Sequence, residues 1–431
     1  MHPRLLPAPG WLWAPSLLLI LVSCASPERR NSQVEQVRIV DTDDGYRLTV
    51  DGRDFFVTGM NWDYFPVGTN YAYSLWDESD DIIEEALDRE MTLLQEMGVN
   101  AIRQYVGVPP RWIAYIHAKY GIYTVINHPL GRYGVSVNGQ WMPNTDYSDP
   151  DARAVIIEEV VDMVESLKDT PGVLMWLLGN ENNYGLVWSS AETENLPEEE
   201  RDIARATPLY TLFGEAATRI KEMDRFRPVA MANGDLGYLD LIANHAQSID
   251  IFGTNSYRGM TFTDLFDRVR AEFDRPVFFT EFGADRYNAL EEREDELNQA
   301  RYLIANWRDI YLNAAGMDGA DNAIGGLTFQ WSDGWWKYGQ ESNLDVHDTN
   351  ASWHNGGYSH DYVEGQNNMN EEWFGVVAKG PTDERNQFAL YPRAGYHVLQ
   401  QIHRRTPYGQ VVNQQEMEAF FSSIVLERTQ D

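Results

Sequence analysis

The chain has 431 residues, and its 66 acidic against 34 basic residues give a net charge of −32 at pH 7. A hydrophobic content of 43% and an aromatic content of 13% exclude an intrinsically disordered chain, and the length allows a large buried core. The acidic excess excludes nucleic acid as a partner, because such a surface repels phosphates. It is compatible with an exported protein that binds uncharged ligands.

The first 24 residues have the pattern of an export signal. Arg4 precedes an apolar stretch over residues 12–22, which is too short to span a bilayer well. The stretch ends in Leu-Val-Ser-Cys24, which resembles the bacterial lipoprotein signal, in which the Cys becomes the lipidated N-terminus. Cys24 is the only cysteine, so an intrachain disulfide, a thiolate metal site and a cysteine nucleophile are excluded.

We therefore expect a signal peptide over residues 1–23, a lipidated Cys24 and a polar tether over residues 24–36. The protein would then be an exported bacterial lipoprotein, anchored to a membrane in the periplasm or at the cell surface. An ordinary signal with an incidental cysteine is the alternative.

A β-hairpin is predicted over residues 37–54, because alternating strands flank the turn Asp43-Asp44-Gly45. From Phe55 onward, strand and helix patterns alternate eight times. The predicted strands are 55–60, 99–105, 122–127, 172–178, 228–233, 250–255, 276–281 and 323–330. The predicted helices are 80–97, 111–120, 152–168, 209–223, 236–246, 262–273, 294–314 and 392–402.

Eight alternating units predict an α/β fold, a single (β/α)8 TIM barrel over residues 55–405 with a C-terminal tail over 406–431. A doubly wound sheet is the alternative, which is less favoured because no Gly-x-Gly-x-x-Gly motif opens a helix. The long connections 182–207 and 331–372 follow the fourth and eighth strands, on the face where barrel enzymes carry their active sites.

Two of the predicted strands end in a glutamate. The apolar segment Gly172–Leu178 is followed by Gly179-Asn180-Glu181, and Pro276–Thr280 is followed by Glu281. Glycosidic cleavage needs a proton for the leaving oxygen and a negative charge or nucleophile beneath the anomeric carbon. Two nearby carboxyls can divide these tasks, because like charges keep one of them protonated. The alternative is that both glutamates are buried partners of barrel arginines.

Further motifs stand at other strand ends, and with the two glutamates they form a set: Asn100–Arg103, Asn255–Tyr257, Thr280–Gly283 and Trp331. The set resembles the clan of retaining β-glycosidases built on (β/α)8 barrels and is most similar to the catalytic barrel of glycoside hydrolase family 2.

The resemblance implies a role for each residue. Glu181 would be the acid/base and Glu281 the nucleophile, and Asn180 would bind the sugar 2-hydroxyl. Arg103 and Tyr257 would contact the nucleophile, and Trp331 would form the aromatic floor of the sugar site. Family 2 enzymes normally carry β-sandwich domains before the barrel, where this chain has only a hairpin. The family's galactosidase and glucuronidase specificities are therefore not implied, and bare barrels of this type also resemble β-1,3-glucan hydrolases and glucanosyltransferases.

Several other polar and aromatic residues are candidates for substrate contact, each with a structural role as the alternative: His128, Asn61, Trp62 and Asp333. One or more of Trp335, Trp336 and Trp353 in the 331–372 connection are expected to join Trp331 in lining sugar subsites. The His and Asp residues of that connection match no tight ligand spacing, so neither a metal nor a cofactor is predicted.

The sequence thus predicts a retaining β-glycoside hydrolase that acts on a β-linked polysaccharide or oligosaccharide, with β-glucan favoured, through a glycosyl-enzyme intermediate. A transglycosylase using the same site is one alternative. A non-catalytic glycan-binding lipoprotein is less favoured because both carboxylates are present, and a metal-dependent barrel hydrolase because the first strand lacks His-x-His. The expected partners are the carbohydrate and, through the lipid anchor, a membrane.

Overall fold

The computed structural model describes residues 34–188, 190–409 and 412–429, which belong to one folded unit, Val34–Asp431. The predicted signal peptide, the lipidated Cys24 and most of the tether lie outside the described residues. Among the helices that are described, none has the length and apolar character needed to cross a bilayer.

The centre of the unit is a closed parallel sheet. Its strands, in spatial order, are β10 (Val229–Met231), β9 (Val173–Leu178), β6 (Tyr123–His128), β5 (Ala101–Tyr105), β4 (Val57–Asn61), β16 (Ala323–Thr328), β13 (Val277–Phe282), β12 (Phe252–Asn255) and β11 (Asn233–Gly234). The first and last, β10 and β11, are two parts of one strand interrupted at Ala232. Because β10 pairs with β9 and β11 pairs with β12, the sheet closes into eight strand positions, and the predicted TIM barrel is confirmed.

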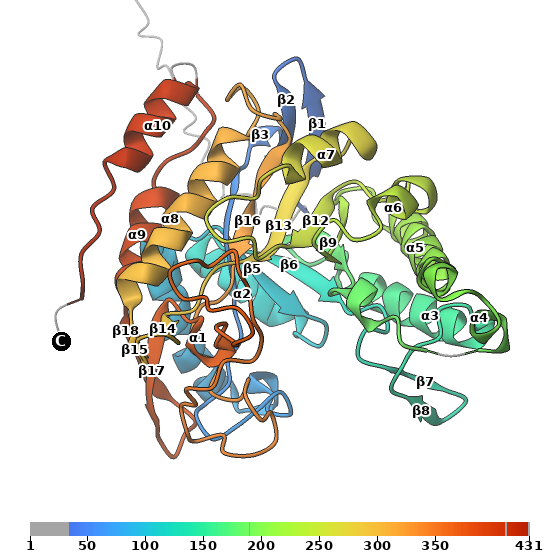
Figure 1. The fold of residues 1–431 in the computed structure, drawn as a ribbon, viewed down its shortest axis with the longest axis horizontal. Coiled ribbons are helices and arrows are strands. Elements are labelled where there is room, and N and C mark those ends of the chain that lie inside the picture. The colour runs from blue at the N-terminus through green and yellow to red at the C-terminus, as the bar shows by residue number, and fades with distance from the viewer. Residues whose placement is uncertain (1–33, 189, 410–411, 430–431) are drawn as a thin grey trace, which may run out of the picture. The chain divides into compact units, whose positions relative to one another are not determined.

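Helices surround these strands (Figure 1). They are α1 (Asp80–Met97), α2 (Pro110–Tyr120), α3 (Pro150–Leu167), α5 (Glu198–Met223), α6 (Leu239–His245), α7 (Leu265–Glu272), α8 (Glu296–Leu312) and α9 (Ala394–His403). The α1 stripe of Ile83, Leu87, Met91 and Leu94 is fully buried, and Gly98 ends the helix in the left-handed conformation (φ 88°).

The N-terminal strands β1 (Val37–Thr42), β2 (Gly45–Val50) and β3 (Arg53–Asp54) form a small antiparallel sheet. Their buried side chains Leu48 and Val50 belong to the same apolar cluster as barrel residues such as Val57 and Leu177. The backbone of this sheet also bonds to Phe226 and Asp321, which precede the amino ends of β10 and β16. The sheet therefore closes the barrel at the end opposite to Glu181 and Glu281.

Two segments differ from the prediction. The 182–207 connection is largely helical, containing η2 (Asn182–Gly185), α4 (Ala191–Glu194) and the first turns of α5. The C-terminal segment carries α10 (Gln414–Ser422), whose buried Met417 and Phe421 are one helical turn apart on the face that packs against α8. The remaining short elements are η1 (Leu75–Asp77), β7 (Val135–Val137), β8 (Gln140–Met142), β14 (Tyr287–Asn288), β15 (Arg293–Glu294), η3 (Glu371–Trp373), β17 (Val377–Thr382) and β18 (Phe388–Pro392).

Candidate active site

A cleft of about 1300 Å³ opens at the carboxyl ends of the barrel strands. The predicted site residues that line it are Asn61, Trp62, Arg103, Asn180, Glu181, Tyr257 and Glu281. Residues from five strand ends therefore meet in one cavity, as expected for a TIM barrel active site. Both strand-end glutamates lie in it.

Glu281 accepts hydrogen bonds from two donors. Arg103 Nη1 donates to one of its oxygens at 2.7 Å, and the Tyr257 hydroxyl donates to the other at 3.1 Å. The side chain of Arg103 is 2% exposed and that of Glu281 is 13% exposed, so the ion pair is shielded from water. Each carboxyl oxygen of Glu281 therefore has a hydrogen-bond donor, and one of the two donors carries a positive charge.

Arg103 also joins the other strand ends. It donates to Asn127 Oδ1 at 2.7 Å, to Asn61 Oδ1 at 3.3 Å and to Asn180 Oδ1 at 2.9 Å. Asn61 in turn donates to the carbonyl of Thr280, the residue before Glu281. These bonds fix the guanidinium in one orientation, so that Glu281 meets a preorganised partner.

Asn180 is oriented by its neighbours as well. Its Oδ1 accepts from Arg103 and from Asn255 Nδ2 at 3.1 Å, and its Nδ2 donates to the hydroxyl of Tyr133 at 2.8 Å. The amide therefore cannot rotate freely, and its edge is presented to the cleft beside Glu181.

Glu181 has a different environment from Glu281. Its backbone is left-handed (φ 54°), a conformation that a non-glycine residue keeps only when its surroundings impose it. Here the amide of Glu181 donates to Ala232 O, and its carbonyl accepts from the amide of Tyr184, both at 2.9 Å. The resulting turn points the side chain into the cleft.

Burial raises the pKa of Glu181 to about 7, and the negative charge of Glu281 adds to the rise. Asn255, Arg132 and Arg103 offset part of it. Glu181 thus keeps a proton up to about pH 7, in the same cleft as a carboxyl that is paired with Arg103.

Three predicted substrate contacts do not line the cleft. Trp331 is fully buried and its indole N–H donates to Glu90. Asp333 is 1% exposed and pairs with both terminal nitrogens of Arg286, at 2.6 and 2.7 Å. His128 is 3% exposed and its Nδ1 accepts from the amide of Leu130. Each of these side chains is buried and forms a hydrogen bond or an ion pair with a protein partner. The structure therefore gives these residues roles in packing and ion pairing.

The tryptophans of the 331–372 connection divide between the cleft and its support. Trp336 and Trp353 line the cleft, as predicted for one or more of them, and Trp353 packs edge-on against the ring of Tyr257. Trp335 stacks on His347 instead, and Trp331 lies in the core. Aromatic cleft residues that the sequence reasoning missed include Tyr105, Tyr133 and Trp141.

A further signal for Trp141 was present in the sequence. The segment Val135–Met142 alternates around Asn138-Gly139, which is the pattern of a hairpin with a tight turn, and it forms β7 and β8. Trp141 on this short hairpin is 59% exposed.

Within the described residues, no group of three or more His, Cys, Asp or Glu side chains is arranged to hold a metal ion.

Comparison with known proteins places this geometry in context. The model of the TIM barrel domain of glycosyl hydrolases family 2 matches residues 80–316. The 1,3-β-glucanosyltransferase gel2 of Aspergillus fumigatus is 28% identical over 264 residues, covering 55% of this chain and 51% of that protein. The 1,3-β-glucanosyltransferase GAS4 of Saccharomyces cerevisiae is 26% identical over 296 residues, covering 63% and 55%. A β-galactosidase of Leuconostoc mesenteroides is 28% identical over 182 residues, covering 40% and 16%.

Solved structures share the fold. The β-glucuronidase 2 of Bacteroides uniformis, covalently bound to cyclophellitol-6-carboxylate aziridine, superposes with a TM-score of 0.54 at 18% identity, covering 86% of this chain and 37% of that one. A β-galacturonidase of Eisenbergiella tayi bound to galacturonate gives 0.53 at 15% identity, covering 86% and 54%. The chain spans about half the length of the first curated relatives that it matches.

Proposed function

The chain belongs to glycosyl hydrolases family 2, and we propose that it is a retaining β-glycoside hydrolase acting on β-linked polysaccharides or oligosaccharides, β-glucans in particular. One observation carries the proposal. Glu281 accepts hydrogen bonds from Arg103 and Tyr257, while the pKa of Glu181 in the same cleft is raised to about 7. This asymmetry supplies a nucleophile and a general acid in one site.

The first step forms the glycosyl-enzyme. A carboxylate oxygen of Glu281 attacks the anomeric carbon, the bond to the leaving oxygen breaks, and Glu181 gives its proton to that oxygen. The Tyr257 and Arg103 donors remain on Glu281 and fix the angle of attack.

The second step reverses the roles. Once Glu281 is an ester its negative charge is gone, so one of the two causes that raise the pKa of Glu181 is removed. Glu181 then takes a proton from water, the water oxygen bonds to the anomeric carbon, and the ester bond returns its electrons to Glu281. Two inversions give net retention.

The substrate class follows from the cleft and from the relatives. A cavity of about 1300 Å³ is larger than the roughly 300–1000 Å³ that holds one small molecule, so several sugar rings fit. Trp336 and Trp353 line the cleft, and indole rings are suited to contact with the apolar faces of pyranose rings. The first relatives are named 1,3-β-glucanosyltransferases, which favours β-glucan over other β-linked chains.

The same relatives favour a second candidate, transglycosylation. The first step is identical, but in the second the hydroxyl of an acceptor sugar replaces water. Both candidates use the same glycosyl-enzyme, so they differ only in what occupies the leaving-group side of the cleft after the first step.

We also propose that the barrel is exported and anchored through a lipidated Cys24. The support is the Leu-Val-Ser-Cys24 pattern after an apolar stretch and the absence of any other cysteine from the sequence.

Azide tests the assignment of the glutamates. On a substrate with a good leaving group, Glu181→Ala should be rescued by azide and give the β-glycosyl azide, because azide attacks the intermediate. Glu281→Ala should give the α-azide, because azide replaces the nucleophile on the opposite face. Glu165→Ala, an exposed glutamate on α3, is the matched control and should resemble wild type. Initial release of the α-anomer from a β-linked substrate, seen by proton NMR, would contradict retention.

A further inference from the structure

The cleft wall carries several exposed aromatic side chains that the chemistry above does not use, and Tyr184 and Trp141 are the most exposed of them. Tyr184 is 58% exposed and Trp141 is 59% exposed, and both line the cleft. We propose that Tyr184 and Trp141 form the subsite for the sugar on the leaving-group side, which also receives the acceptor sugar. This inference rests on the proposed function and names the residues that bind the second sugar.

The backbone of Tyr184 is hydrogen-bonded to that of Glu181, the proposed acid. Its amide donates to the carbonyl of Glu181 within η2, and Asn183 locks η2 to β11 through two bonds with Gly234, at 2.8 and 2.9 Å. The ring lies directly on Gly234, because a Cβ there would be 2.4 Å from Cε2 of Tyr184 and 2.6 Å from Cζ. Only a glycine at position 234 leaves room for the ring, so the close approach of the Tyr184 ring to the backbone depends on this glycine.

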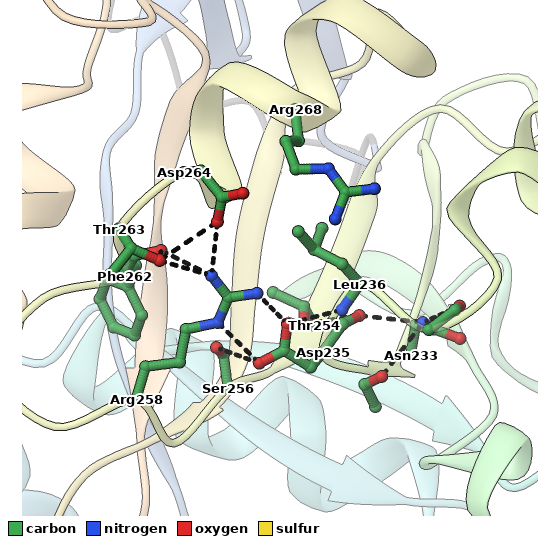
Figure 2. Close-up of polar contacts among 12 residues, drawn as sticks. Asn233, Asp235, Leu236, Thr254, Ser256, Arg258, Phe262, Thr263, Asp264 and Arg268 are labelled. Carbon is green, nitrogen blue, oxygen red and sulfur yellow. Dashed lines mark hydrogen bonds and ion pairs between the residues drawn. The ribbon is translucent and has the colours of Figure 1, made fainter. Parts of the chain in front are cut away.

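Asp235, the residue after Gly234, is held in place by the polar contacts that Figure 2 shows. Asp235 has a left-handed backbone (φ 46°), and its carboxylate accepts from Arg258 Nε at 2.8 Å, Ser256 Oγ at 3.2 Å and Leu236 N at 2.7 Å. Arg258 is anchored in turn to Phe262 O at 2.9 Å and to Asp264 Oδ1 at 3.0 Å. With its acceptor sites occupied, Asp235 is a positioning residue rather than a sugar ligand.

Trp141 lies on the β7–β8 hairpin, lines the same cleft and also packs on a glycine. A Cβ at Gly134 would be 2.5 Å from Cζ2 of the indole. The neighbouring Tyr133 bonds to Asn180, and Arg132 lies against Gly185, because a Cβ at Gly185 would be 2.9 Å from Arg132 Nη1. The segment that presents Trp141 is therefore connected to the Asn180-Glu181 turn and to the turn that presents Tyr184.

The proposed reaction determines which part of the substrate lies beside Glu181. Glu181 protonates the oxygen that leaves, so the group attached to that oxygen lies beside Glu181. Exposed aromatic rings that are already immobilised lose little entropy on binding, and they match the apolar face of a pyranose. In the transfer step, the acceptor hydroxyl gives its proton to Glu181 as its oxygen bonds to the anomeric carbon and the ester bond to Glu281 breaks.

A substrate whose leaving group is too small to need a subsite separates binding of the leaving-group sugar from formation of the glycosyl-enzyme. With β-laminaribiosyl fluoride, the bond to fluoride breaks as the ester to Glu281 forms, and fluoride departs with the electron pair. Tyr184→Ala and Trp141→Ala should keep wild-type fluoride release at saturating donor. On laminaripentaose each should lose about tenfold in kcat/KM, and transfer to added laminaribiose should fall by a similar factor.

Two further variants serve as controls. Tyr184→Phe keeps the ring and should resemble wild type, whereas Asp235→Asn, which weakens the support of the platform, should raise KM for laminaripentaose without slowing fluoride release. Wild-type kinetics on laminaripentaose for both alanine variants would overturn the subsite. Absence of fluoride release from the wild-type enzyme and from every variant would instead contradict the proposed function.

Discussion

The pKa of Glu181 should depend on the charge of Glu281. Glu281→Gln keeps the shape of the side chain and its place beside Arg103 and Tyr257, but it removes the negative charge. Burial is the larger cause of the rise from 4.5 to about 7, and the Glu281 charge is the second. The variant should therefore lower the pKa of Glu181 by about one pH unit, equivalent to ~1.4 kcal/mol, and leave it above the ordinary value.

Carbon-13 NMR of protein labelled at the glutamate side-chain carboxyl measures this directly. The Glu181→Gln spectrum identifies the resonance, which is then titrated in wild type and in Glu281→Gln. The kinetics provide an independent check, because Glu181 acts as an acid only when protonated. In wild type, kcat/KM should fall as the pH rises through about 7.

The reasoning would be refuted if Glu181 titrated at the same pH in both proteins. That result would mean that burial alone raises its pKa, and esterification of Glu281 could not then switch Glu181 from acid to base. A fall of the pKa to the ordinary glutamate value would refute it in the other direction, because it would assign the whole rise to charge.

Three further outcomes are expected. Trp336→Ala and Trp353→Ala should each raise KM about tenfold at unchanged melting temperature, and wild-type steady-state kinetics in both would count against sugar platforms. Arg103→Met leaves Glu281 as an unpaired, shielded charge and should cost about 3–5 kcal/mol in the free energy of unfolding by urea, so equal stability would contradict a buried pair. Cys24→Ser should move the protein from the membrane to the soluble fraction on cell fractionation, and unchanged partitioning would end the lipoprotein proposal.

The barrel and the convergence of its strand-end residues in one cleft could be predicted because strand geometry determines both. A short, uniformly apolar run such as Val173–Leu178 favours a strand buried on both faces, and it is a fully buried strand. All parallel strands of a barrel end at one face, so polar residues at those ends converge whatever their distance along the sequence. Glu181, Glu281 and Arg103 meet in the cleft for that reason.

The same rule does not determine the direction of a side chain that stands beyond the end of a strand: Glu181 and Trp331 each lie three residues past one, and only Glu181 lines the cleft. Trp331 stands three residues after the end of β16, where pairing with neighbouring strands no longer determines which way a side chain points. Its direction is set by Glu90 on α1, a partner 241 residues away that is itself fully buried. Asp333 is likewise turned away from the cleft by Arg286. A partner so distant in sequence leaves no local signal, so the pattern that located the cleft could not say which of the tryptophans enter it.

The turn after β9 connects the proposed acid, Glu181, to the ring of Tyr184, which is the proposed sugar platform beside it. Glu181 needs a left-handed backbone to aim its carboxyl, and the carbonyl of that same residue then accepts the amide that begins η2. The turn in turn places Asn183 against Gly234 and the Tyr184 ring on the bare backbone of that glycine. The conformational cost of the catalytic residue is thus offset by bonds that also fix the neighbouring ring. In the proposed reaction, Glu181 held in this turn would protonate an oxygen at one fixed point, and the neighbouring Tyr184 ring would position the sugar that carries that oxygen.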